Sequence, residues 1–296
     1  MKTILSILVI FCFTKWSNAQ TIEKFSIDSG GASVTAGGIE ILYTIGEVNV
    51  QELSSGNIQV SEGFINPITL MIKLDPKIFL EGPYATSLMN DDLRIAGIIP
   101  TSSPYIDNVT CNASVFNTTG TNAVIDWVWI EIRDSADGIT VITEKSALLL
   151  ANGSVVATDG VSTVPIDVPI GNYYVMVSHR NHLGILTANT VNLSGGTTVL
   201  DLTSNSNLIM GGSNGIANMG DGKFALYAGD FNGDGNIQNT DRNAVEPLRG
   251  LTGYNNADMN LDGEVQNVDI NNFLNPNLGK GEQFTSNRLY AKRKTN

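Results

Sequence analysis

Short stretches of alternating apolar and polar residues recur along most of the chain, separated by turns rich in glycine, asparagine and proline. A period of two residues is typical of half-buried β-strands. In residues 21–66 this pattern predicts a small meander of about four strands. Residues 123–133 form the strongest predicted strand, and both of its faces are rich in apolar groups. We therefore expect it to be a central strand.

Turn signals then recur about every 8–12 residues, which predicts a β-sandwich over residues 72–203. The Asp137-Gly138 pair is a hairpin signal in this stretch. One helix is predicted over residues 88–95, with Ser87 near its N-cap. The further strands are predicted at residues 139–143, 147–150, 155–158, 164–168 and 173–179.

The first 19 residues have the features of a signal peptide. Lys2 supplies the positive start, residues 4–13 are apolar, and small residues end the segment at Ala19. The apolar stretch is shorter than the roughly 20 residues that span a bilayer, and no second stretch of spanning length follows. We expect a secreted or outer-surface protein with no membrane span.

Changes in pattern along the chain divide it into six segments of a mainly β protein. A glycine-rich β-meander follows the signal peptide, a linker rich in serine, asparagine and glycine follows the sandwich, and a basic tail ends the chain. The predicted boundaries are 1–19, 20–70, 72–203, 204–227, 228–284 and 285–296.

The formal net charge of −12 gives the chain no electrostatic reason to bind nucleic acid or an anionic membrane. Residues 230–269 hold eight acids and two bases, so half of the total, −6, lies in this window. Such a window is either a solvated acidic face or a cation site, and the spacing of the acids decides between them.

A twelve-residue pattern of the form Asp-x-Asn-x-Asp-Gly begins at Asp230 and recurs 28 residues later, at Asp258. Calcium binds six to eight hard oxygens, which such a loop presents from positions 1, 3, 5, 7, 9 and 12. Glycine stands at position 6, where the chain must turn. We therefore predict two Ca²⁺ ions, held by Asp230, Asn232, Asp234, Asn236 and Asp241 and by Asp258, Asn260, Asp262, Glu264 and Asp269.

Each loop has Asp at position 12, a predicted helix after it, at residues 240–248 and 268–274, and no obvious helix before it. This arrangement resembles a type I dockerin, a small module of duplicated calcium loops and helices. The resemblance implies a cohesin-like protein partner. In that family the partner-reading positions follow position 9, here Asn239-Thr240 and Asn267-Val268.

Two further parts of the chain, the glycine-rich meander and the predicted sandwich, resemble exported proteins of the Bacteroidetes. Residues 37–47 and 61–64 resemble a glycine-rich module of such proteins, and residues 168–175 resemble a strand of transthyretin-like sandwiches. Residues 79–84, 126–131, 171–174 and 179–184 resemble haemagglutinin- or adhesin-like surface proteins. A transthyretin- or immunoglobulin-like sandwich is the fold that these resemblances imply.

No set of residues indicates catalysis or an organic cofactor. His179 and His182 lack a third metal ligand in the sequence, and we interpret them as a structural polar turn. Asp126 and Glu131 fall on opposite strand faces, which does not fit a carboxylate pair for glycoside hydrolysis. Cys111 is interpreted as a buried structural thiol.

Trp127 and Trp129 share one strand face and are interpreted as core, with an aromatic platform for sugar rings as the alternative. Two functions follow. The first is a secreted, non-catalytic calcium-binding interaction protein, an adhesin or assembly component. The second is an accessory component of glycan degradation that binds a cell-surface polysaccharide.

Overall fold

The structure is a computed structural model. It describes the backbone of residues 30–36, 39–45, 51–55 and 58–62, and all atoms of residues 71–285. The predicted signal peptide and residues 286–296 of the predicted tail lie outside the described residues. The chain divides into two compact units, Met1–Thr69 and Leu70–Asn296. No helix within the described ranges has the length and hydropathy of a transmembrane segment.

The first unit contains four described strands, in the segment where the alternation predicts a meander. They pair as two antiparallel hairpins, and the described residues record no pairing between the hairpins. The strands are β1 (Gly30–Ala36), β2 (Ile39–Ile45), β3 (Gln51–Ser55) and β4 (Ile58–Glu62).

The second unit is built on a six-stranded antiparallel sheet in which β8 is central, as its two apolar faces predict. Strand β8 pairs with β9 on one side and β12 on the other. Residues 139–150, predicted as two strands, form mainly one, β9. In sheet order the strands are β10 (Val155–Val156), β9 (Val141–Leu150), β8 (Val124–Asp134), β12 (Gly171–His179) and β13 (His182–Leu186), with β14 (Val191–Leu193) also on β12.

A second, three-stranded sheet has β5 (Ile72–Lys77) between β11 (Val164–Ile166) and β15 (Gly196–Asp201). Strand β15 runs parallel to β5, a pairing that the sequence pattern does not predict. Buried residues of both sheets belong to one hydrophobic core, which burial of apolar surface stabilises. The unit is therefore mainly β, with two sheets around a shared core.

The predicted helix over residues 88–95 is wrong in its first half. Leu88 and Met89 form strand β7 (Leu88–Met89), which pairs with β6 (Tyr84–Ala85), and α2 (Asp92–Ile95) begins only afterwards. Thr86 and Ser87 adopt positive φ angles of 48° and 64°, which form the tight turn of this hairpin and prevent Ser87 from capping a helix.

Residues 204–227, predicted as a linker, are packed against the sheets. Ile209 and Ile216 are buried, and Leu226 donates its backbone N–H to the Phe79 carbonyl at 2.8 Å. The short elements here are η3 (Ser206–Leu208), η4 (Gly212–Asn214), β16 (Ala217–Asn218) and β17 (Phe224–Ala225), and η1 (Ala113–Asn117) and η2 (Gly120–Asn122) precede β8.

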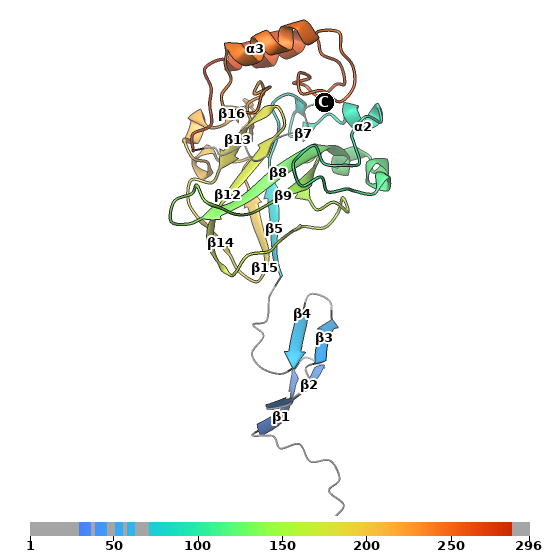
Figure 1. Ribbon diagram of the computed structural model, residues 1–296, viewed down its shortest axis with the longest axis vertical. Coiled ribbons are helices and arrows are strands. Elements are labelled where there is room, and N and C mark those ends of the chain that lie inside the picture. Colours follow the sequence, from blue (N-terminus) through green and yellow to red (C-terminus); the bar gives the residue numbers. More distant parts are fainter. Residues whose placement is uncertain (1–29, 37–38, 46–50, 56–57, 63–70, 286–296) are drawn as a thin grey trace, which may run out of the picture. The chain divides into compact units, whose positions relative to one another are not determined.

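The C-terminal segment covers one end of this unit, where Figure 1 shows α3 (Asn239–Val245) above β13 and β16. A second hydrophobic cluster lies beneath it. Ile237, Val265, Ile270 and Leu274 of the C-terminal segment pack there with Leu183 of β13. The remaining elements are η5 (Glu246–Leu248), η6 (Asp269–Leu274) and η7 (Asn275–Asn277).

Candidate calcium loops and the surface that holds them

Residues 230–241 (loop 1) and 258–269 (loop 2) each lead directly into a helical segment, as their sequences predict. Loop 1 leads into α3, which stops at Val245 before the short turn η5. Pro247 lies in that turn and has no N–H with which to continue an α-helix. Loop 2 leads into η6, which has π-helical geometry where an α-helix is predicted.

The aspartate at position 12 ties each loop together. In both loops its two carboxylate oxygens accept hydrogen bonds from the backbone N–H groups of positions 3 and 9. Asp241 accepts from Asn232 and Gln238 at 3.1 and 2.9 Å, and Asp269 accepts from Asn260 and Gln266 at 3.2 and 2.7 Å.

The side chains at positions 1, 3 and 5 also accept the same backbone hydrogen bonds in both loops. The backbone N–H at position 6 donates to Asp at position 1, over 3.3 Å to Asp230 and 2.8 Å to Asp258. The N–H at position 5 donates to Asn at position 3, and the N–H at position 7 to Asp at position 5. These distances are 2.9 and 2.9 Å in loop 1 and 3.3 and 2.9 Å in loop 2.

The backbone turns in the same way in both loops. Position 4 has φ angles of 70° at Gly233 and 60° at Leu261, and position 6 has 84° at Gly235 and 90° at Gly263. Left-handed backbone is costly for a residue with a Cβ, so three of these four positions being glycine fits the geometry. Leu261 is the exception.

The aspartates at the two ends of each loop are shielded from solvent. The first and last aspartates, Asp230, Asp241, Asp258 and Asp269, are all fully buried. Burial raises the pKa of Asp241 and Asp269, and it raises that of Asp258 to about 7 although the Arg180 charge opposes the shift. Buried carboxylates of this kind are stabilised by a nearby cation.

The donor set of each loop matches the preference of Ca²⁺ in chemical type. Side-chain oxygens stand at positions 1, 3, 5 and 12, the carbonyls of Asn236 and Glu264 stand at position 7, and Gln stands at position 9. Within the described residues no three His, Cys, Asp or Glu side chains are grouped to hold a metal by themselves. In each loop the carboxylates accept hydrogen bonds from the loop's own backbone N–H groups. The candidate ligands of each loop also include amide and carbonyl oxygens.

The hairpin between β12 and β13 inserts into the C-terminal segment. Arg180 at its tip is fully buried, donates to the Asn255 carbonyl and lies 4.3 Å from the Tyr254 ring centroid. Asn181, also fully buried, donates from Nδ2 to the carbonyls of Asn256 and Asp258 at 3.0 and 2.6 Å. The second of these carbonyls belongs to position 1 of loop 2.

Residues 79–84, which follow β5, also contact the C-terminal segment. Glu81 accepts hydrogen bonds from the Ala228 N–H at 2.9 Å and from Asn277 Nδ2 at 2.6 Å. Gly82 approaches the chain so closely that a Cβ there would lie 1.7 Å from the Met259 carbonyl oxygen. Two segments that carry the resemblance to surface proteins, 79–84 and 179–184, therefore contact the part of the chain that contains the two candidate loops.

The two histidines, interpreted from the sequence as a structural polar turn, are buried and hydrogen-bonded within the fold. His179 Nε2 lies 3.1 Å from Asp126 Oδ2, and His182 Nε2 accepts from the Gly82 N–H at 3.3 Å. Their Nδ1 atoms are 3.0 Å apart, and both rings are buried. They join the hairpin to β8 and to residue 82.

Trp127 and Trp129 are fully buried core residues, so they offer no platform to a sugar ring. Trp127 Nε1 donates to the Pro100 carbonyl at 2.9 Å, and Trp129 Nε1 to Glu131 at 3.3 Å. Cys111 is half-buried where the sequence predicts full burial, and burial raises the pKa of its thiol.

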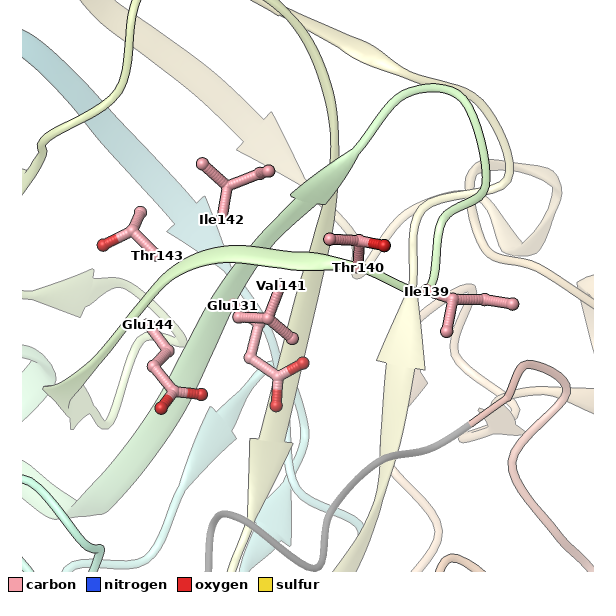
Figure 2. Close-up of a pocket in the computed structure, with 7 residues that line it drawn as sticks. All are labelled: Glu131, Ile139, Thr140, Val141, Ile142, Thr143 and Glu144. Carbon is pink, nitrogen blue, oxygen red and sulfur yellow. The ribbon is translucent and has the colours of Figure 1, made fainter.

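A pocket of ≈ 380 Å³ lies along β8 and the start of β9. No residue of loop 1 or loop 2 lines it, and no sequence pattern indicates it. Figure 2 shows Glu131 and Glu144 on neighbouring strands among its lining residues. Burial, Glu131 and Asp107 raise the pKa of Glu144. Ile139 and Ile142 line the same pocket and are partly exposed.

No protein-family model and no curated protein matches the chain. Two solved chains from Acetivibrio cellulolyticus are similar to it at 16% identity, and each comparison covers 71% of this chain. One is from a C-terminal interface mutant of a type II cohesin–X-dockerin complex, with 97% of that chain covered and a TM-score of 0.39. The other is from an N-terminal interface mutant, with 95% covered and a TM-score of 0.35. Scores this low do not establish a shared fold.

Proposed function

We propose that this chain is a non-catalytic, calcium-binding interaction protein, secreted or held at the outer cell surface. Its module of residues 228–284 would bind a cohesin-like protein partner. The observation that carries the proposal is the duplicated loop, in which positions 3, 5, 6, 7 and 9 make the same hydrogen bonds twice. Each loop would hold one Ca²⁺ through the ten residues predicted from the sequence.

Calcium would supply the positive charge that the buried carboxylates need and would join the two ends of each loop. Asp230 and Asp241 stand at the first and last positions of loop 1, and Asp258 and Asp269 at those of loop 2. All four are fully buried. A loop closed by an ion is more rigid, and a rigid module presents a fixed surface to a partner.

The buried polar groups support a non-catalytic role. Asp126, His179 and Arg180 would otherwise be the most suggestive cluster in the chain. All three are fully or almost fully buried, and His179 and Arg180 both bond to Asp126, so no substrate can reach them. The glycan-binding alternative depended on Trp127 and Trp129 and loses its support with their burial.

The partner surface proposed from the dockerin resemblance is accessible in this fold. Asn239 and Thr240 are exposed after position 9 of loop 1, and Asn267 is exposed after position 9 of loop 2. Val268 is half-buried. Exposed polar residues at the start of a helical segment can exchange water for a partner without unfolding the module.

The test is calcium-dependent capture of a purified cohesin domain by the full chain, measured by biolayer interferometry in millimolar Ca²⁺ and in EGTA. The proposal expects capture in Ca²⁺, release in EGTA, and loss of capture in Thr240→Arg. Thr197→Arg is the matched control, because Thr197 is an exposed threonine of β15 far from the module in sequence. Capture that persists in EGTA, or that Thr240→Arg leaves intact, would contradict the proposal.

A further inference from the structure

The two loops have the same internal geometry but different surroundings. In loop 1 the side chains at positions 3, 5 and 7 are exposed. In loop 2 positions 3 and 5 are half-buried, and Leu261 at position 4 is buried in the hydrophobic core of the two sheets. Gly233, the equivalent residue of loop 1, has no side chain to insert.

Loop 2 is also held at its first residue. Asn181 Nδ2 donates to the backbone carbonyl of Asp258 at 2.6 Å, and Gly82 lies against the carbonyl of Met259. Both contacts come from turns that follow strands of the two sheets, so the backbone at positions 1 and 2 is fixed by residues far away in the sequence. Loop 1 is held just before its first residue instead: Gly229 donates its N–H to the Asn181 carbonyl at 3.0 Å, and Ala228 donates its N–H to Glu81.

The number of acidic residues also favours tighter binding by loop 2. Loop 1 carries three acids, Asp230, Asp234 and Asp241, with Asn236 at position 7. Loop 2 carries Asp258, Asp262 and Asp269, and Glu264 at position 7 adds a fourth. The nearby Arg180 would disfavour a cation, but its charge is offset by the Asp126 carboxylate 2.8 Å away. The affinity of such loops for Ca²⁺ rises with ligand charge and with rigidity.

We infer that the two calcium sites are unequal: the sheets preset loop 2, which fills first, and Asn181 is the positioning residue for that site. Loop 1 is the weaker and more open site. This inference rests on the proposed calcium binding. It also makes residues 179–184 and 79–84 part of the calcium-binding structure, a role that the sequence motifs alone did not indicate.

The experiment is a calorimetric titration of the calcium-free full chain with CaCl₂. Wild type should show two classes of site whose dissociation constants differ by at least about tenfold. Asp234→Asn and Asp262→Asn are matched variants, because both residues stand at position 5 and accept the same backbone hydrogen bond. Asp262→Asn should remove the tighter class, and Asp234→Asn should remove only the weaker one.

Asn181→Ala should weaken the tighter site by about 10–100-fold, the usual effect of losing a group that orients a metal ligand. Asn277→Ala is its control, since Asn277 also donates two buried Nδ2 hydrogen bonds but contacts Glu81 and Ala228 and not loop 2. If Asn181→Ala lacks the near-ultraviolet circular dichroism of wild type, it is not folded. The comparison of Asp234→Asn with Asp262→Asn then tests the inference.

The possible outcomes separate this inference from the proposed function. Two equal sites in wild type, loss of the tighter site in Asp234→Asn, or unchanged affinities in a folded Asn181→Ala would each overturn the inference while leaving calcium binding in place. Absence of any Ca²⁺ binding by wild type would overturn the proposed function and the inference together.

Discussion

Arg180, at the tip of the β12–β13 hairpin, donates from Nε to Oδ2 of Asp126 on β8 at 2.8 Å, and both side chains are fully buried. Asp126 Oδ1 accepts a further bond from the Tyr254 hydroxyl at 2.6 Å, just before loop 2. One buried ion pair therefore joins the central strand, the hairpin and the segment that leads into loop 2.

Breaking this pair should be costly. Asp126→Asn leaves the Arg180 charge buried without its counter-charge, and loss of one partner of a buried pair costs about 3–5 kcal/mol. Glu246→Gln is the matched control, because Glu246 pairs with Arg242 at the surface and such pairs contribute at most about 1 kcal/mol. The measurement is urea unfolding of the full chain. Equal midpoints for the two variants would contradict the role given to the buried pair.

The contribution of this pair should depend on pH only in acid. Burial opposes ionisation of Asp126, but the Arg180 charge and hydrogen bonds from His179 and Tyr254 outweigh it and hold the pKa well below its usual range. A carboxyl with a lowered folded pKa adds stability above its unfolded pKa of about 3.9, and that stability is lost as the pH falls toward the folded pKa.

The difference in urea midpoint between wild type and Asp126→Asn should therefore be constant from neutral pH down to about pH 5, and should shrink below about pH 4. Unfolding curves recorded across this range provide the check. A difference that grows on acidification would contradict a lowered pKa of Asp126 in the folded chain.

Gly82→Ala should separate the calcium module from the sheets. The new Cβ would lie 1.7 Å from the Met259 carbonyl oxygen, which is backbone and cannot rotate away, and such overpacking costs typically about 1–3 kcal/mol or more. Gly97→Ala is the control: no atom lies within 4 Å of a Cβ there, and its φ of 68° means that alanine adds backbone strain without the close contact. Gly82→Ala should be cleaved by protease within residues 228–284 sooner than Gly97→Ala. Equal cleavage rates would count against this close contact.

Leu261 offers a test of backbone strain inside loop 2. Its φ of 60° favours glycine, while its buried side chain contributes to the core. Leu261→Ala and Leu261→Gly both lose the side-chain packing, but only glycine relieves the left-handed conformation, by roughly 1–2 kcal/mol. The glycine variant should therefore unfold at higher urea than the alanine variant, which reverses their usual order. The usual order would show that this residue is unstrained.

Local patterns predicted the elements whose causes are local. Alternation identified residues 123–133 as a central strand, and the calcium motif placed the turns at Gly235 and Gly263 and the helical segments after them. Leu88 was misassigned to a helix because the positive φ angles of Thr86 and Ser87, residues without a strong turn signal, created a hairpin instead.

The contacts that distinguish the two loops could not be predicted, because they join residues far apart in the sequence. Arg180 and Asn181 lie in a segment interpreted as a structural polar turn, and their burial depends on contacts with residues 254–258. Leu261 reads as an ordinary loop residue at a position where Gly233 occurs in the first copy. Its burial depends on the core of two sheets whose strands lie 60 to 189 residues earlier in the sequence.

The central claim, that the chain binds two calcium ions, is tested most directly by native mass spectrometry of the full chain with a matched melting curve. We expect two retained Ca²⁺ ions and a higher melting temperature, since a ligand at 100 times its dissociation constant adds about 2.7 kcal/mol. Both effects should disappear in the double variant Asp234→Asn/Asp262→Asn. A wild-type chain that retains no Ca²⁺ and melts at the same temperature in millimolar Ca²⁺ and in EGTA would contradict it.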